Sequence, residues 1–560
     1  MAVKYMVASI EFKLLAPNNR AAALIGSFSN WQNLPMVKGE DGYFRTQVEL
    51  KDGVYRYQFR VQPPSNALMT QEWVTVNDPY AVEIDRATET SVLRINQGQK
   101  IVDTYGWQYD HQLLPTNEEL AIYEIQVADF ARTEAEGYAG GTFKQVIEKL
   151  DYLSELGINA IELMPVNEYP GNYSWGYKVR YFFAVESSYG TTEDLKCLID
   201  ECHRRGIRVI LDGIYNHSDE GSPLLLIDRN YWYYPDRHYP EDPANYWGPE
   251  FNYDQEDGKL NLRPAWQFIG DVVRFWIEEY HIDGIRYDAV RQLGNLDFLS
   301  WIVEVAKAAA GDKPFYNIAE HIPEKIEWVA PQGPMDGCWH ESFRIFALAN
   351  LAGDNFDLGR LREILNPKQQ GYCSPTNVIN YLASHDRDHV MALENFYTLA
   401  HPEAIQRVKL GAALLFTAVG VPMLWMGEEF GEDTRSTPNQ PSHLQWSLLK
   451  QDLNFRLWKY YQALIHLRTS NPALYTANIE FFHENPEAKV LAYQRSHPQG
   501  ARVVVVANFS PQHLAGYRIS NFPSGKWREW TRHWEREVDE GELQVDLSAW
   551  EAQVFVSQLL

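Results

Sequence analysis

The chain has 560 residues, which is too long for one ordinary hydrophobic core, so we expect roughly two to four domains. Its 75 acidic and 50 basic side chains give a formal net charge of −25. This balance argues against nucleic acid or an anionic membrane as a partner, because both require clustered positive charge. No run of about 18 apolar residues occurs, and the first residues lack a basic stretch followed by an apolar core, so the sequence predicts a cytoplasmic protein.

Residues 1–105 are predicted to form a β-sandwich. Short apolar stretches at 9–15, 21–25, 43–50 and 53–61 alternate with turn signals such as Lys51-Asp52-Gly53. Strands that are this short and this evenly spaced are typical of a small sandwich.

Residues 106–472 alternate between strand and helix patterns. Strands are predicted over 121–127, 158–164, 208–215, 284–288, 314–320, 337–339, 377–384 and 421–426. Helices are predicted over 193–205, 264–280, 297–309 and 403–416, and another begins at Thr142, where Gln145 completes a capping box. Eight strand–helix units predict a closed (β/α)8 TIM barrel, which is an α/β fold.

Two further segments complete the predicted architecture. The stretch 218–263, after the third barrel strand, is too long for an ordinary loop, so we expect an inserted lobe there. Residues 473–560 return to short strands and predict a C-terminal β-sandwich.

Composition also bears on the ligand. Aromatic residues make up 14% of the chain, and sugars stack the flat C–H faces of their rings on such side chains, so a neutral carbohydrate fits the composition. The four cysteines have no C-x-x-C spacing, so neither a zinc site nor a redox site is predicted.

Four apolar runs in the barrel region end in polar residues, which we call the rim motifs: Asp212/Asn216/His217, Arg286/Asp288, Glu320 and His385/Asp386. An apolar run of this kind predicts a buried parallel strand. Because parallel barrel strands present their carboxyl ends at the same rim, we expect these side chains to meet there.

Carboxylates at one rim suit glycoside cleavage. Cleavage with retention needs a nucleophilic carboxylate and a carboxylic acid roughly 5–5.5 Å apart, and Asp288 and Glu320 on adjacent strands can supply them. Arg286 lies two residues before Asp288 and points the same way, so we expect it to keep Asp288 ionised. Glu320 needs a raised pKa, which apolar surroundings and the charge of Asp386 would provide.

The rim motifs resemble, in order, those of the α-amylase superfamily, glycoside hydrolase family 13: D-x-x-x-N-H, G-x-R-x-D, a strand ending in Glu, and H-D. The resemblance extends from residue 120 to about residue 470. It implies that Asp288 is the nucleophile, that Glu320 is the acid/base, and that Asp386 binds and distorts the sugar at subsite −1.

The resemblance also implies a set of substrate-binding residues. His217 and His385 would hydrogen-bond hydroxyls of the −1 sugar. Trp175-Gly176-Tyr177 resembles the family segment whose tyrosine stacks on that sugar, which makes Tyr177 the expected platform. Asp212 is expected to order Arg286 rather than to react. The implied set is Tyr177, His217, Arg286, His385, Asp212 and Trp175.

Two features leave alternatives open. Asn216 matches a position that ligates structural calcium in many amylases, but no other ligand is matched, so structural calcium stays an open, unsupported alternative and no cofactor is predicted. Residues 26–31 and 77–79 resemble a family-48 carbohydrate-binding module, which accompanies branching enzymes, isoamylases and trehalose-forming hydrolases. Trp31 in this module would either bind sugar or pack in the sandwich core.

The expected reaction is hydrolysis of α-1,4-glucosidic bonds in glycogen-like or starch-like glucan or in maltooligosaccharides. The segment 212–217 resembles hydrolases, because branching enzymes usually lack its Asn, whereas 282–286 and 383–386 suit branching enzymes equally well. The second hypothesis is therefore a 1,4-α-glucan branching enzyme, followed by a maltooligosyltrehalose trehalohydrolase or an isoamylase-type debranching enzyme. A glucan-binding protein without activity is disfavoured, because all three acids are present. The oligomeric state is not predicted.

Overall fold

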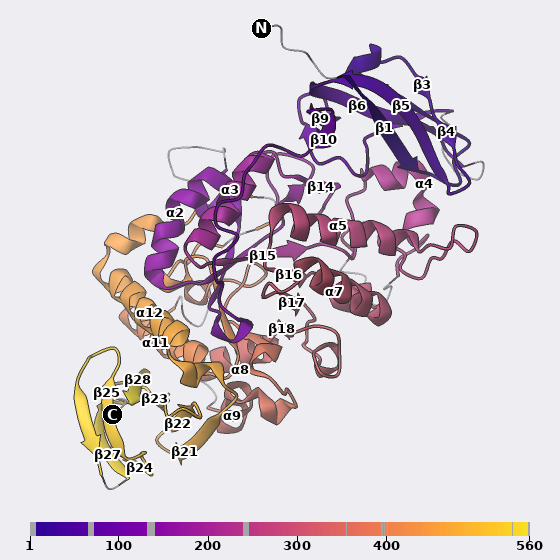
Figure 1. Cartoon of the computed structure of the whole chain (residues 1–560). Coiled ribbons are helices and arrows are strands. Elements are labelled where there is room, and N and C mark those ends of the chain that lie inside the picture. Colours follow the sequence, from indigo (N-terminus) through magenta and orange to yellow (C-terminus); the bar gives the residue numbers. More distant parts are fainter. Residues whose placement is uncertain are drawn as a thin grey trace.

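The computed structural model describes residues 7–557 apart from 65–71, 132–139, 239–245, 354–355, 394–395, 397, 400, 436, 439 and 540. It contains a closed parallel barrel with a β-sheet domain at each end of the molecule (Figure 1). The predicted fold class is therefore confirmed. In the described residues, no helix has the length and apolar character needed to cross a membrane.

The N-terminal domain consists of two antiparallel sheets. One contains β1 (Val7–Leu15), β5 (Tyr43–Lys51) and β4 (Val37–Lys38); the other contains β10 (Gln99–Ile101), β9 (Thr90–Asn96), β6 (Gly53–Gln62), β2 (Ala21–Gly26) and β3 (Leu34–Pro35), with β7 (Val74–Val76) and β8 (Ile84–Asp85) at its edges. Alternate apolar residues such as Phe12 and Phe59 form the core between the sheets. Trp31 is 43% exposed, so it is not a core residue of this sandwich.

The barrel contains eight parallel strands and closes by pairing of the last strand with the first. They are β11 (Ile122–Ile125), β12 (Ala160–Leu163), β15 (Arg208–Gly213), β16 (Gly284–Tyr287), β17 (Tyr316–Ala319), β18 (Gly337–Trp339), β19 (Val378–Asn380) and β20 (Val421–Trp425). Most of these strands are shorter than predicted. The chain leaves β11 after Ile125, for example, because Val127 already begins helix α1.

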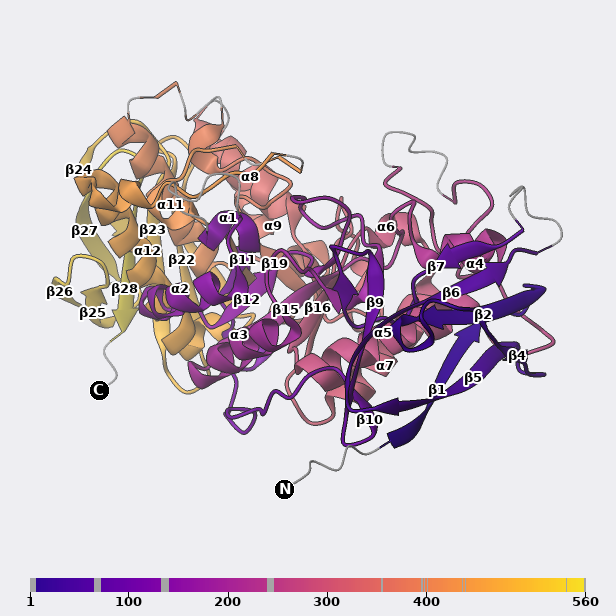
Figure 2. The same cartoon turned by 90° about the horizontal axis from the view of Figure 1, so that it is seen from above.

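Helices surround the barrel and cover its outer face (Figure 2). They are α1 (Val127–Ala131), α2 (Phe143–Leu156), α3 (Thr192–Arg204), α5 (Pro264–Tyr280), α6 (Val290–Leu293), α7 (Leu296–Ala310), α8 (Glu341–Ala352), α9 (Leu358–Leu365), α11 (His401–Thr417) and α12 (Asp452–Ser470). The predicted capping box of Thr142 and Gln145 opens α2. This helix buries Phe143, Val146 and Leu150, each worth roughly 1.5–3 kcal/mol when removed from water.

The stretch after β15 leaves the barrel and packs against the N-terminal domain. It contains helix α4 (Pro223–Trp232), and its residues 239–245 lie outside the described part of the chain. The Asn19 side chain donates a hydrogen bond to the Ile227 carbonyl at 2.9 Å. In the loop after β12, which contains β13 (Asn167–Glu168) and β14 (Tyr181–Val185), Glu168 and Glu186 form ion pairs with Arg86 of the N-terminal domain. These contacts hold the domain to the barrel.

The C-terminal domain packs on α11 and α12 (Figure 1). Its larger sheet has the order β21 (Ile479–Asn485), β22 (Val490–Ser496), β23 (Arg502–Asn508), β28 (Glu551–Ser557), β25 (Gly525–Glu529) and β26 (Glu535–Val538), and β24 (Leu514–Ser520) pairs with β27 (Glu542–Leu547). The Trp530 indole N–H donates to the Ala463 carbonyl of α12 at 2.7 Å, which fixes this domain to the barrel.

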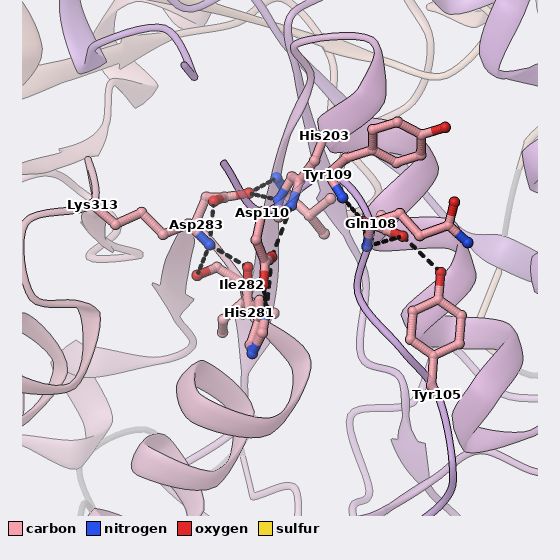
Figure 3. Close-up of polar contacts among 11 residues, drawn as sticks. Tyr105, Gln108, Tyr109, Asp110, His203, His281, Ile282, Asp283 and Lys313 are labelled. Atoms are coloured by element: carbon pink, nitrogen blue, oxygen red, sulfur yellow. Dashed lines mark hydrogen bonds and ion pairs between the residues drawn. The ribbon is translucent and has the colours of Figure 1, made fainter. Parts of the chain in front are cut away.

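A buried polar network lies where the linker from the N-terminal domain meets the barrel (Figure 3). Asp200 of α3 accepts hydrogen bonds from the Tyr105 hydroxyl at 2.9 Å and from the Tyr109 amide at 2.8 Å. Asp283, directly before β16, is completely buried and contacts His203 at 2.9 Å and Lys313 at 2.7 Å. Although burial alone would raise the pKa of Asp283, these partners lower it to about 2. The network thus anchors the start of the strand that carries Arg286.

Candidate active site

The rim motifs converge at the carboxyl ends of the barrel strands. Asp288 and Glu320 directly follow β16 and β17, and His385 and Asp386 follow β19. A cavity of about 480 Å³ opens above them. It is lined by Ser174, Trp175, Tyr177, Lys178, His217, Trp247, Asp288, Ala289, Glu320, His385, Asp386, Arg387 and Pro438.

Arg286 contacts three acids, two of which line the cavity. Its guanidinium is completely buried, with Nη1 at 2.8 Å from Asp288 Oδ1 and at 2.6 Å from Asp212 Oδ1. Its Nη2 lies 3.3 Å from Glu320 Oε2. One planar cation therefore contacts both acids that the sequence predicts to react, and they flank the same space. The predicted contact of Asp212 with Arg286 is present as well.

The two acids influence each other's protonation. Burial raises the pKa of Asp288 well above its usual value, and the negative charge of Glu320 adds to this shift, although Arg286 opposes it. Burial also raises the pKa of Glu320, again against Arg286 and with help from Asp386. The raised pKa of Glu320 agrees in direction with the expectation. The expected low pKa of Asp288 is not found, because burial outweighs its ion pair with Arg286.

Asp386 differs from these two acids because its side chain is 42% exposed. Burial alone would raise its pKa, but the positive charges of His385, Arg286 and Arg387 outweigh burial and lower it. Asp386 is therefore ionised at neutral pH and supplies the negative charge that is expected beside Glu320.

His385 belongs to a chain of hydrogen bonds that crosses the barrel. Its Nδ1 lies 2.5 Å from Glu124 Oε1, and its Nε2 lies 2.8 Å from the Tyr177 hydroxyl, which donates to Asp212 Oδ2 at 2.5 Å. The Tyr177 ring also stacks on the imidazole at 5.1 Å. Burial alone would lower the pKa of His385, but Asp386 and Glu124 raise it to about 9, so both ring nitrogens carry protons at neutral pH.

His217 contacts the backbone of Tyr177. Its Nε2 donates to the Tyr177 carbonyl at 2.8 Å, and its Nδ1 lies 3.3 Å from the Asn216 amide nitrogen. Burial lowers the pKa of His217 to about 4, which makes the imidazole neutral. A sugar hydroxyl would have to share its N–H with this carbonyl, which makes His217 less available than the sequence implies.

The remaining predicted residues have clear positions. Trp175 is 7% exposed, lines the cavity and meets the His385 ring edge to face at 5.5 Å. Asn216 directs its amide nitrogen at His217 rather than at a group of acidic oxygens. In the described part of the chain, no three His, Cys, Asp or Glu side chains are grouped to hold a metal ion.

Three residues near the cavity were missed. Glu124 and Glu162 are register partners on β11 and β12, and each is an isolated acid in an apolar strand, a pattern that could have identified them. Trp247 lies on the stretch after β15, lines the cavity and is 5.7 Å from the His217 ring. Its neighbour Gly248 has a positive φ of 157°, and a Cβ there would collide with the Ser218 carbonyl, so glycine permits this approach.

Three family models match the chain in order. Residues 2–81 match carbohydrate-binding module 48 (isoamylase N-terminal domain), residues 124–225 match the α-amylase catalytic domain, and residues 482–557 match the α-amylase C-terminal all-β domain.

Curated relatives include two kinds of enzyme. A 1,4-alpha-glucan branching enzyme of Pseudoalteromonas atlantica is 25% identical over 568 residues, covering 94% of this chain and 76% of the relative. A malto-oligosyltrehalose trehalohydrolase of Saccharolobus solfataricus is 29% identical over 365 residues, covering 59% of this chain and 60% of the relative.

Solved structures with the same fold include a pullulanase from Bacillus acidopullulyticus, with a TM-score of 0.80, 24% identity, and coverage of 99% of this chain and 74% of that one. A putative alpha amylase from Salmonella typhimurium has a TM-score of 0.72 and 22% identity, and covers 98% of both chains. At these identities the likeness concerns the fold.

Proposed function

The chain belongs to the α-amylase family, and from this premise we propose that it is a retaining hydrolase of α-1,4-glucosidic bonds in glycogen-like or starch-like glucan or in maltooligosaccharides. The observation that carries the proposal is the contact of Arg286 with both Asp288 and Glu320. This contact keeps the two carboxyls at one cavity, and a retaining mechanism requires two carboxyls that can flank one bond.

In the proposed first step, Asp288 attacks the anomeric carbon and forms a glycosyl ester, while Glu320 protonates the departing glycosidic oxygen. Because Asp288 makes the shorter contact with Arg286, 2.8 Å against 3.3 Å, we assign the negative charge to Asp288 and the proton to Glu320 in the reactive form. In the second step Glu320 takes a proton from water, the water oxygen bonds to the anomeric carbon, and the ester to Asp288 breaks.

The surrounding residues support positive charge on the −1 sugar. Asp386 is ionised and partly exposed beside the cavity, where it can bind sugar hydroxyls and stabilise an oxocarbenium-like transition state. Tyr177 is the proposed stacking platform, and its hydroxyl is held by Asp212 and His385. Trp175 forms part of the same wall.

A branching transferase is the second candidate, because a 1,4-alpha-glucan branching enzyme aligns with 94% of this chain. Hydrolase and transferase share the glycosyl ester and differ in whether water or a sugar hydroxyl resolves it. The trehalohydrolase alternative follows from the 29% identity with that relative. The cytoplasmic location stays a prediction from the sequence.

Incubation with amylose separates these activities. The proposal expects reducing ends to rise with time while α-1,6 linkages, measured by proton NMR, stay constant. New α-1,6 linkages without a rise in reducing ends would assign the transferase, and release of trehalose from a trehalose-capped maltooligosaccharide would assign the trehalohydrolase. The Glu320→Gln variant serves as the blank for contaminating activity.

A further inference from the structure

A second cavity of about 310 Å³ lies at the junction of the barrel and the C-terminal domain. Residues of α11, α12, the turn after β25 and strand β28 line it, and these elements lie together in Figure 1. No residue that lines the catalytic cavity also lines this one. The two cavities are therefore separate sites.

Positive side chains dominate this cavity although the chain carries a net charge of −25. Lys409 comes from α11, Arg456 and Lys459 from α12, and Arg532 from the turn after β25; Glu551 is the acidic residue among the lining residues. Three elements distant in the sequence thus bring four cations to one hollow. A protein that is acidic overall would otherwise be expected to spread its cations among its acids.

Within the described residues, the ion pairs of this region leave Lys409 without a carboxylate partner. Arg532 pairs with Glu551, and Arg456 pairs with Asp452 one helical turn away at 3.0 Å. In the described part of the chain, Lys409 contacts no carboxylate; its ammonium lies 5.5 Å from the centre of the Tyr460 ring. Burial lowers the pKa of Lys409, and the charges of Arg456 and Arg532 lower it further, so the three cations repel one another.

We propose that this cavity binds a phosphomonoester, with the phosphate held by Lys409, Arg456 and Arg532. A phosphate oxygen accepts charge-assisted hydrogen bonds from lysine and arginine and would remove the repulsion among these side chains. The cavity is larger than a phosphate group, and the partly buried Tyr460 ring forms one wall on which a sugar ring can stack. The ligand class is therefore a phosphorylated sugar, and the site does not depend on the function proposed above.

Isothermal titration of the full chain with inorganic phosphate, glucose 6-phosphate and glucose, at constant ionic strength, tests the site. We expect both phosphate compounds to bind and glucose to give no signal at this cavity. Tighter binding of glucose 6-phosphate than of phosphate would assign a sugar phosphate, whereas equal binding would assign the phosphate group alone. Absence of binding by the wild type at about 10 mM of either compound would overturn the proposal.

Variants locate the binding. Lys409→Gln should weaken phosphate binding by about tenfold or more, whereas Lys409→Arg should keep most of it. Lys450→Gln is the matched control, because Lys450 lies two residues before the start of α12 and does not line the cavity. Equal weakening in Lys409→Gln and Lys450→Gln would show a general charge effect and refute the site. Because Lys409 is repelled by its neighbours, its replacement by Gln should leave the melting temperature unchanged or raise it, so loss of binding is separable from loss of folding.

Discussion

Replacing Glu124 by Gln removes the charge that faces His385 from inside the barrel while keeping an oxygen that can accept the Nδ1–H. In the wild type, Glu124 contacts both the Nδ1 and the backbone N–H of His385, at 2.5 Å and 3.1 Å. The substitution therefore keeps the shape of the side chain while it removes the charge and one of the two acceptor oxygens. We classify Glu124 as a positioning residue that acts through His385.

The size of the expected effect of Glu124→Gln follows from the pKa of His385. A rise from 6.5 to about 9 corresponds to about 3 kcal/mol in favour of the doubly protonated ring. Two acids produce this rise against burial, and Asp386, the other acid, is 42% exposed and partly screened by solvent. Without the Glu124 charge we expect the pKa of His385 to fall by about one unit or more.

The assay is the pH dependence of kcat/KM on maltooligosaccharide. As His385 loses its proton, Asp386 loses the charge that lowers its own pKa and the Tyr177 hydroxyl loses a donor. The alkaline limb of the profile should therefore move to lower pH in Glu124→Gln by about one unit.

Glu162→Gln is the matched control. Glu162 is the register partner of Glu124 on the next strand, and its carboxylate oxygens are buried without a hydrogen-bond partner. Burial raises the pKa of Glu162 well above 4.5, and the charge of Glu124 adds to this, so neutral Gln replaces an already neutral acid. Its profile should match the wild type. An unchanged alkaline limb in Glu124→Gln, or the same shift in both variants, would refute this reasoning.

Three further predictions concern the acid, the cavity wall and stability. Glu320→Gln should lower kcat by at least about a hundredfold while isothermal titration still detects maltooligosaccharide binding; full activity would remove Glu320 from its assigned role. Trp247→Ala should raise KM about threefold to tenfold in initial-rate measurements, because a ring that a sugar can stack on is lost; an unchanged KM would place Trp247 outside the substrate path. Glu428 is completely buried, and burial, with the charge of Glu429, raises its pKa to about 8 although the Tyr461 hydroxyl opposes the shift. The pKa of Glu428 is higher in the folded state than in the unfolded state. Below about pH 4.5 Glu428 therefore does not destabilise the fold, and its destabilising contribution grows as the pH rises toward 8. Glu428→Gln should therefore be more stable than the wild type by on the order of 3 to 5 kcal/mol at pH 9 and similar at pH 4, as measured by denaturant unfolding; equal stability at both pH values would contradict this.

Local patterns in the sequence were sufficient to predict the fold and the position of the acids that are proposed to react. The capping box at Thr142 and the short apolar strand 337–339 depend on neighbouring residues, so both could be predicted and both are present. The acids that end the barrel strands share a rim because parallel strands present the same end to one side. Recognising the two strands was therefore enough to place Asp288 and Glu320 at that rim.

Protonation and hydrogen bonding in the site required the tertiary structure. Glu124 and His385 are 261 positions apart, and no local pattern indicates that one carboxylate raises the pKa of that imidazole. The expectation that Asp288 is ionised was based on the charge of Arg286 alone. The pKa of Asp288 also depends on burial and on every other charge that the barrel brings near it. The pKa of each acid depends on its burial and on all nearby charges, and only the folded chain brings those residues together. The sequence was therefore enough to locate the acids, whereas their protonation depends on the three-dimensional arrangement.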